Sequence, residues 1–195
     1  MHKVITLFAF LILNSSFFVL NSEAGTVQLS QTGQTTCYDS SGAVINCGGT
    51  GQDGNLRAGT AWPSQRFTVS GNCVTDNLTG LVWAKDGNLA GTQTWQGALD
   101  WVAAMNSGDG LCGQHDWRLP NLNELESLVN TEQANSATWL NGQGFINVQA
   151  YFYWSSSTFA YDTDRAYIVN LGDGDVSADL YKSVLRYRWP VRAGQ

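Results

Sequence analysis

Two pairs of aspartates, each with one residue between its members, are the first candidates for chemistry in this sequence. One pair is Asp162 and Asp164, and the other is Asp173 and Asp175. In an extended strand, side chains two positions apart share a face, with Cα atoms about 6.5 to 7 Å apart. Two carboxyl groups on one face suit acid and base catalysis at a glycosidic bond. A glycan-acting hydrolase is therefore one hypothesis, although acids in turns are more commonly solvated.

Catalysis by a histidine and binding of a metal have weaker support. His115 is the only histidine apart from His2, and a hydrolytic triad needs a base that hydrogen-bonds its nucleophile. The neighbours of His115 have a structural explanation, so we expect it to cap or lie on the surface, and we expect no enzyme. Asp173 and Asp175 could ligate calcium, but calcium takes roughly six to eight oxygen ligands. We expect no cofactor and keep calcium as the weaker alternative.

A run of aromatic and short polar residues is the better candidate for function. It lies within residues 130–165, the longest loop-rich stretch, and binding residues concentrate on loops held by a rigid frame. Aromatic faces beside short hydrogen-bonding groups, here Ser155–Ser157, suit sugar rings or protein loops. We expect Tyr153 and Trp154 to fill the core instead. The candidate ligand-binding residues are Tyr151, Tyr161, Asp162 and Arg165.

A strand end, a proline and a capped helix follow one another between His115 and Leu128, in the sequence HDWRLPNLNELESL. The Asn121 side chain can cap the helix by accepting from a first-turn N–H, and Glu124 can reach back to complete a capping box. Apolar residues then recur at helical spacing. So compact a unit is better explained as scaffold than as an active site. Its structural residues are Trp117, Arg118, Pro120, Asn121 and Glu124.

Periodicity and turn residues predict the other elements. Residues 66–69 alternate as a strand, and a turn at 77–80 precedes a second strand at 81–83, which predicts a hairpin. Thr94 caps a helix that stops at residues 106–110, whereas residues 130–143 are polar and predict a loop. Strand patterns follow at 151–159, 165–171, 176–180 and 185–191, and Pro190 ends the last one or places it at an edge. Two helices between short strands indicate an α+β domain.

Four cysteines follow the first 24 residues, namely Cys37, Cys47, Cys73 and Cys112. They allow three pairings, and the sequence alone does not choose among them. The short loop from Cys37 to Cys47 encloses Gly42 and looks like a stapled turn, which would leave Cys73 for Cys112. Zinc is the competing explanation, but the chain has no CxxC pair. We therefore expect disulfides, which form outside the cytoplasm.

The formal net charge of −6 limits the partners. An acidic surface repels polyphosphates and strongly sulfated chains, so we expect no nucleic-acid partner. The exception is a basic C-terminal cluster, which we interpret as alternating, solvated strand positions. If it met the acidic body of another copy, the domain would be a surface or envelope assembly module, which is an alternative hypothesis. The cluster consists of Lys182, Arg186, Arg188 and Arg192.

The first 24 residues have the layout of a secretory signal peptide, with Lys3, an apolar run, and small residues at Ser22 and Ala24 before the expected cut. The run falls short of the roughly 20 apolar residues of a spanning helix. We therefore expect no membrane span after cleavage and a secreted, periplasmic or cell-surface protein. Residues 25–65 would be a flexible leader and a disulfide-stapled, Gly-rich loop, and residues 66–195 the folded domain.

Several motifs occur in a characteristic order: CYDSSGAVINC, TDNLTGLVWAKD, TWQGALDW, DWRLPNLNELESLV, YWSSS and the ending WPVRAGQ. Together they resemble the DUF1566 family, also called the C-terminal domain of the Legionella collagen-like protein. The resemblance implies a C-type-lectin-like fold, in which two helices flank a small antiparallel sheet and loops bind ligands. The calcium-binding triplets EPN, QPD and WND are absent here. We thus expect a bacterial, adhesin-like recognition domain for a glycan or a cell-surface protein.

Overall fold

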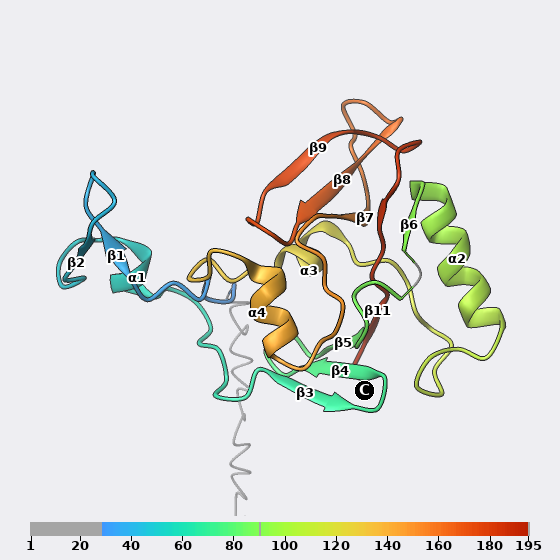
Figure 1. The fold of residues 1–195 in the computed structure, drawn as a ribbon, viewed down its shortest axis with the longest axis horizontal. Coiled ribbons are helices and arrows are strands. Elements are labelled where there is room, and N and C mark those ends of the chain that lie inside the picture. Colours follow the sequence, from blue (N-terminus) through green and yellow to red (C-terminus); the bar gives the residue numbers. More distant parts are fainter. Residues whose placement is uncertain (1–28, 90, 195) are drawn as a thin grey trace, which may run out of the picture.

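The computed structural model describes residues 29–89 and 91–194. The predicted signal peptide and its cleavage site lie outside these residues. The chain forms a mixed α/β body, mostly sheet with few helices, and a small lobe that projects from one side of the body (Figure 1). Within the described ranges, no helix has the length and apolar character needed to cross a membrane.

A four-stranded antiparallel sheet forms one end of the body, at the bottom of Figure 1. Its strands in spatial order are β11 (Val191–Ala193), β5 (Leu81–Ala84), β4 (Cys73–Asp76) and β3 (Phe67–Ser70). The predicted hairpin is in fact two hairpins, because β4 pairs with both β3 and β5. Gly71 and Gly80 sit in the connecting turns with φ values of 58° and 73°, which only glycine adopts without steric cost.

A five-stranded sheet forms the other end of the body. Its strands in spatial order are β6 (Thr92–Gln93), β10 (Arg186–Tyr187), β7 (Phe152–Thr158), β8 (Arg165–Asn170) and β9 (Val176–Tyr181). The β7–β8–β9 meander is antiparallel and follows the predicted strand patterns. The strand predicted over residues 185–191 is in fact two strands, because the chain leaves the five-stranded sheet after β10, passes through Pro190 and enters the four-stranded sheet as its edge strand β11.

Helices in the described ranges are α1 (Asp53–Leu56), α2 (Trp95–Ser107), α3 (Leu122–Glu126) and α4 (Ser136–Gly142). Both predicted caps are present, since Thr94 Oγ1 accepts from Gly97 N–H and Asn121 forms the capping box with Glu124. The prediction of a loop over residues 130–143 is wrong, because α4 occupies half of it. Asn135 caps α4, and apolar side chains of the helix reach the core.

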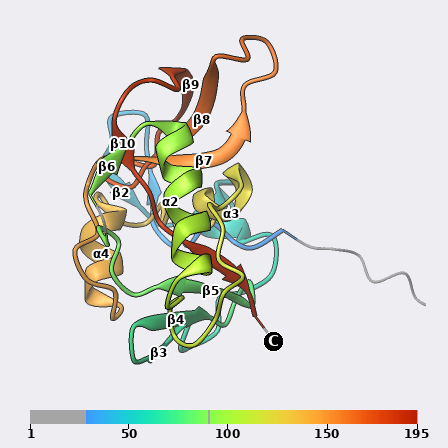
Figure 2. The ribbon, with the colours of Figure 1, turned by 90° about the vertical axis from the view of Figure 1, so that its right-hand side faces the viewer.

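Hydrophobic clusters lie on both faces of the five-stranded sheet, because successive strand residues point to opposite sides. Tyr153 and Trp154 are both fully buried, as predicted, but belong to different clusters. The Trp154 side packs against α2, which lies in front of the sheet in Figure 2. The Tyr153 side packs against α3, α4 and the four-stranded sheet. The sheet is therefore held rigidly from both sides.

The His115–Leu128 unit is scaffold, as predicted. The Trp117 ring is 3% exposed, and the Asn106 amide bonds both the N–H and the carbonyl of Trp117 at 3.0 and 2.7 Å. Arg118 donates to both carboxylate oxygens of Glu124 at 2.6 Å. The Pro120 carbonyl accepts from the Ser156 N–H in β7 at 2.7 Å, which fastens the unit to the five-stranded sheet.

The projecting lobe contains β1 (Cys37–Tyr38) and β2 (Val44–Ile45). Both predicted disulfides are present: Cys37–Cys47 staples the lobe, and Cys73–Cys112 joins β4 to the segment before the scaffold unit. The leader differs from its prediction over residues 29–36, which run along the body. Ser30 bridges to Thr60, and Glu132 accepts backbone N–H groups of the leader. These hydrogen bonds hold the leader against the body although its sequence contains few apolar residues that could pack there.

The basic C-terminal cluster is not a row of solvated strand positions. Arg188 is 2% exposed and stacks on the Trp101 ring, and Arg192 is 7% exposed and pairs with Asp116 at 2.6 Å. Lys182 lies 4.0 Å from the Trp95 ring centroid. Arg188 and Arg192 are thus engaged by partners within the chain, whereas Lys182 and Arg186 remain partly exposed.

Candidate functional site

Three of the four candidate ligand-binding residues meet at the tip of the β7–β8 hairpin. Arg165 Nε lies 2.9 Å from an Asp162 carboxylate oxygen. The same guanidinium stacks on Tyr181 in β9, with 4.6 Å from Cζ to the ring centroid, and donates to the Tyr181 hydroxyl at 3.3 Å. Tyr161, at the tip itself, is 93% exposed. Arg165 is therefore held in a defined orientation next to an open aromatic ring.

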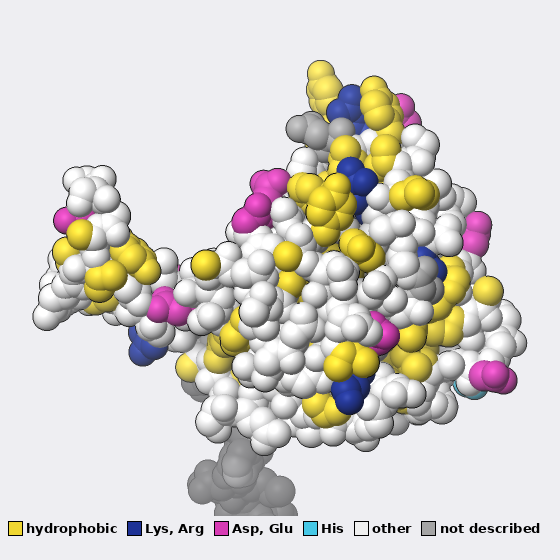
Figure 3. Space-filling view, viewed as in Figure 1, with side chains coloured by type: hydrophobic (Ala, Val, Ile, Leu, Met, Phe, Trp, Pro, Cys, Tyr) yellow, Lys and Arg dark blue, Asp and Glu magenta, His cyan; other side chains and the backbone are white. Residues whose placement is uncertain are grey.

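Two more aromatic rings extend this surface along the hairpin. The Phe159 ring centroid lies 6.0 Å from that of Tyr161 and 5.5 Å from that of Tyr167. Arg165 and Tyr167 alternate along β8 and so share a face of the sheet. Figure 3 shows hydrophobic and basic side chains gathered at this end of the molecule. The five residues that we call the aromatic–arginine face are Phe159, Tyr161, Arg165, Tyr167 and Tyr181.

The serines of the YWSSS stretch anchor this hairpin to the scaffold. Ser155 Oγ donates to the Tyr167 carbonyl at 2.8 Å, and Ser156 bonds Pro120 as described above. Ser157 Oγ accepts from the Leu122 N–H at 3.2 Å. These hydroxyls therefore serve the fold, whereas the sequence suggested that they serve a ligand.

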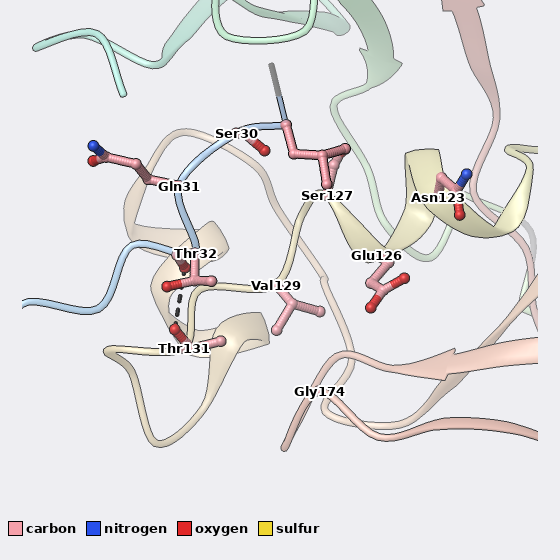
Figure 4. Close-up of a pocket in the computed structure, with 10 residues that line it drawn as sticks. Ser30, Gln31, Thr32, Asn123, Glu126, Ser127, Val129, Thr131 and Gly174 are labelled. Carbon is pink, nitrogen blue, oxygen red and sulfur yellow. Dashed lines mark hydrogen bonds between the residues drawn. The ribbon is translucent and has the colours of Figure 1, made fainter. Parts of the chain in front are cut away.

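A groove follows α3 beside the aromatic–arginine face. Its first part, about 280 Å³ in volume, is lined by Asn121, Leu122, Asn123, Ser157 and Tyr167. Its second part, about 580 Å³, lies between α3, the leader and the β8–β9 turn (Figure 4). Asn123 lines both parts, so they adjoin. We call the two cavities together the α3 groove.

The acids of the hairpin tip interact directly. The carboxyl of Asp164 hydrogen-bonds that of Asp162, which raises the pKa of Asp164 above its usual range. Catalytic carboxyl pairs of glycosidases lie about 5 to 9.5 Å apart, so that a sugar or a water fits between them. Hydrogen-bonded carboxyl groups at an exposed hairpin tip leave no such space.

Tyr151, the fourth candidate, lies at the other end of β7. Its ring contacts Phe152 and Tyr187, with centroids 5.4 and 6.4 Å away, and Arg186 Cζ lies 5.4 Å from the Tyr151 ring centroid. The seven residues of β7 separate Tyr151 from the hairpin tip, which corresponds to roughly 20 Å at about 3.3 Å per residue. Tyr151 is therefore not part of the aromatic–arginine face.

The weak metal candidates lie in the β8–β9 turn. Asp173 and Asp175 are both exposed, and Asp173 Oδ1 accepts from the Asp175 N–H at 3.0 Å, which stabilises the turn. Across residues 29–89 and 91–194, no group of three or more His, Cys, Asp or Glu residues could hold a metal ion. His115 Nδ1 lies 2.8 Å from the Asn106 carbonyl, beside the scaffold unit.

Sequence reasoning missed four residues of this region for a common reason. Phe159 and Tyr167 lay inside predicted strands, where an aromatic residue is usually core. Tyr181 reaches Arg165 only through the β8–β9 register, and Asn123 reaches the site only through the packing of α3. The alternation in RAYIVNL could have placed Tyr167 beside Arg165, but no local pattern indicates Tyr181 or Asn123.

The fold and the site define a disulfide-stabilised, mixed α/β domain that presents an open aromatic face. Residues 72–192 match the model of the Lcl C-terminal domain family, and the chain belongs to this family. The match includes the Cys73–Cys112 disulfide, the scaffold unit and the whole aromatic–arginine face, and it leaves out the projecting lobe. A comparison with curated proteins found no match. Family membership and disulfides are consistent with a surface-associated protein.

Proposed function

We propose that this protein is an exported, non-enzymatic recognition module that binds a glycan or a cell-surface protein through the aromatic–arginine face. The observation that carries this proposal is the exposure of Tyr161 and Tyr181 at a hairpin tip whose Arg165 guanidinium is already held in place by Asp162 and Tyr181. Tyr and Arg are enriched among the residues that dominate binding energy. An oriented Arg165 also loses less conformational freedom on binding than a free side chain would.

The scaffold supports the same proposal. The base of the β7–β8 hairpin is buried on both faces. Two hydrogen bonds join the hairpin to the scaffold unit, because the Ser156 N–H donates to the Pro120 carbonyl and Ser157 Oγ accepts from the Leu122 N–H. Binding groups on a rigid frame recognise a ligand with little reorganisation. A C-type-lectin-like fold is part of the proposal, and two features support it. Helices α2 and α3 flank the sheets, and β11 returns to pair with β5.

A paired stability and binding assay tests the proposal. Labelled wild-type protein, Tyr161→Ala and Arg165→Ala would be applied to a glycan array and to a panel of purified extracellular-matrix proteins. Both variants should keep a melting temperature close to that of the wild type, because surface changes usually cost little. Both should weaken binding about tenfold, or about 1.4 kcal/mol.

Tyr151→Ala is the matched control, because Tyr151 is also a partly exposed tyrosine but lies at the far end of β7. It should bind like the wild type. If Tyr161→Ala and Arg165→Ala both bound with unchanged affinity, the recognition site would have to lie elsewhere on the molecule.

A further inference from the structure

We propose that the ligand of the aromatic–arginine face is an uncharged, linear glycan that continues from this face into the α3 groove. The inference rests on the proposed function and extends it. Tyr167 belongs to both surfaces, because its ring contacts Phe159 on the face and it lines the first part of the groove. A ligand that covers the face therefore meets the groove without crossing a barrier of unrelated residues.

The two cavities lie next to each other along α3 and share Asn123 as a lining residue. From Tyr167 the first cavity runs along the start of α3 to Asn123, and from Asn123 the second cavity runs between α3 and the leader. The volume of the second cavity, about 580 Å³, is within the range of about 300 to 1,000 Å³ that is typical of small-molecule sites. An extended ligand of several units fits this shape better than a single ring does.

The lining of the second cavity selects for hydroxyl groups without charge. Glu126, Asn123 and Thr131 offer a carboxylate, an amide and a hydroxyl group, and Val129 offers an apolar patch. In Figure 4 the Glu126 carboxylate lies beside Val129, near the turn that carries Gly174. Sugar hydroxyls can donate to the carboxylate and the amide oxygen while C–H faces of the ring cover the valine.

Anionic ligands do not suit this cavity. Among the described residues that line it, none is a lysine or an arginine, and the Glu126 carboxylate would repel a sulfate, phosphate or uronate group. The net charge of −6 adds to this repulsion. Arg165 is at the far end of the path and is already paired with Asp162, and Lys182 at the hairpin tip is hydrogen-bonded to the Thr158 hydroxyl and the Thr163 carbonyl.

A peptide ligand also fits less well. Peptides are commonly bound along an exposed strand edge, in an apolar groove that takes one face of a helix, or by arginine clusters. The described residues that line the α3 groove include no arginine, and its apolar residues Leu29, Leu122 and Val129 are interspersed with polar side chains. Gly174 shapes one wall, since a Cβ there would meet Val129 Cγ1 at 2.8 Å.

Calorimetry with oligosaccharides of increasing length tests the inference. The probes are the disaccharides and hexasaccharides of the cello, malto and chito series, with a heparin hexasaccharide and an unrelated acidic peptide for comparison. At least one neutral hexasaccharide should bind about tenfold more tightly than its disaccharide. The heparin hexasaccharide and the peptide should bind more weakly than that neutral ligand.

Substitutions locate the gain in affinity. Asn123 is exposed on α3, so Asn123→Trp should fill the junction of the two cavities and leave the fold intact. It should reduce hexasaccharide affinity to that of the disaccharide, whereas Tyr161→Ala should weaken both lengths. Gln96→Trp is the matched control, because Gln96 is an exposed amide on α2 that lines neither cavity. Gln96→Trp should leave the affinity for both the disaccharide and the hexasaccharide unchanged.

The outcomes separate this inference from the proposed function. Equal affinity for both lengths, hexasaccharide binding that survives Asn123→Trp, or no binding of any neutral probe would overturn the inference. So would preferred binding of heparin or the peptide by the wild-type protein. In each case, a loss of ligand binding on the arrays in Tyr161→Ala would still support the recognition module.

Discussion

Glu124 binds Arg118 and caps α3 with the same carboxylate. Its two oxygens accept from the Arg118 guanidinium at 2.6 Å, and Oε2 also accepts from the Asn121 N–H at 2.8 Å. The adjacent Pro120 carbonyl accepts from Ser156 in β7. The carboxylate therefore stabilises the corner that orients both α3 and the strand leading to the aromatic–arginine face.

Substituting Glu124 by Gln should destabilise this corner in a pH-dependent way. Partial burial raises the pKa of Glu124, but hydrogen bonds from Arg118 and Asn121 outweigh it, so the pKa is lowered overall. A carboxylate with a lowered pKa contributes stability at neutral pH and loses it as the pH falls through the folded-state value. We expect a cost of about 1 kcal/mol at pH 7, because the partly exposed Arg118 is screened by solvent.

Thermal denaturation of both proteins between pH 7 and pH 3 measures this difference. The gap in melting temperature should close as the wild-type carboxylate takes up its proton. Glu126→Gln is the control, because Glu126 is exposed on the same helix. A gap that stayed constant over the whole pH range would show that the charge of Glu124 is not responsible.

The sequence was most informative where the signals are local. The caps at Thr94 and Asn121 depend on residues within one helical turn, and the burial of Trp117 follows from its place in a compact apolar unit. Helix α4 was missed because Ser, Thr and Asn are weak helix formers. Its stability comes from Ala137 and Leu140, which are buried in the core, and a local pattern does not reveal such contacts.

Long-range packing explains two features that the sequence did not predict, namely the burial of the C-terminal arginines and the position of Tyr181 beside Arg165. Arg188 is separated from Trp101 by most of the domain in sequence, yet the two stack in the fold. Tyr161, Asp162 and Arg165 were identified because they are close together in the chain. Tyr181 joins them through strand register alone, so its role could not be read from composition or periodicity.

The two disulfides should differ in their effect on the fold. Cys73 and Cys112 are 39 residues apart and link two parts of the body, whereas Cys37 and Cys47 are 10 residues apart within the projecting lobe. Loop-closure entropy predicts that losing the longer link costs roughly 4 kcal/mol. Replacing both of its cysteines by Ala should therefore lower the main melting transition strongly.

The corresponding change of Cys37 and Cys47 serves as the comparison. It should leave the main transition nearly unchanged, because the lobe adds no residue to either hydrophobic cluster of the body. Calorimetry of both double variants would check this. Equal destabilisation by the two would show that the lobe and the body unfold as one cooperative unit.

At the hairpin tip, Asp164→Asn should increase stability at neutral pH. Hydrogen bonding with Asp162 raises the pKa of Asp164, so the folded state holds this proton more tightly than the unfolded chain does. That contribution is present at low pH and is lost as the pH rises through the folded-state value. Above that value the Asp164 carboxylate is charged beside Asp162, and an amide at position 164 removes this unfavourable interaction while keeping a donor.

Melting temperatures at pH 7 and pH 3 test this sign. The variant should melt higher than the wild type at pH 7, and the two should converge at pH 3. Asp173→Asn is the matched control. The Asp173 carboxylate accepts from the Asp175 N–H, and the amide oxygen of an asparagine can accept the same hydrogen bond. If the wild type melted at a higher temperature than Asp164→Asn at both pH values, the hydrogen bond between Asp162 and Asp164 would not be the cause of the raised pKa of Asp164.

Glu132 holds the leader against the body. Its carboxylate accepts from the Thr35 N–H at 2.7 Å, from the Thr36 N–H at 3.1 Å and from the Thr36 hydroxyl. These hydrogen bonds lower the pKa of Glu132 to about 2, and the bond from the Thr35 N–H has the largest effect. Because the pKa is lowered, docking of the leader is stabilised above the usual Glu range and weakens as the pH falls from roughly 4.5 towards 2.

Amide hydrogen exchange at Thr35 and Thr36 reports this docking directly. Protection factors, corrected for the intrinsic pH dependence of exchange, should fall between pH 5 and pH 2.5 while those of β7 and β8 stay constant. Glu132→Gln should lose the same protection already at pH 6, since an amide offers one acceptor oxygen where the carboxylate uses two. Because Ser30 and Thr32 line the α3 groove, the variant should also weaken any ligand bound there. Unchanged protection in Glu132→Gln would mean that other contacts hold the leader, of which the Ser30–Thr60 bridge is the first to test.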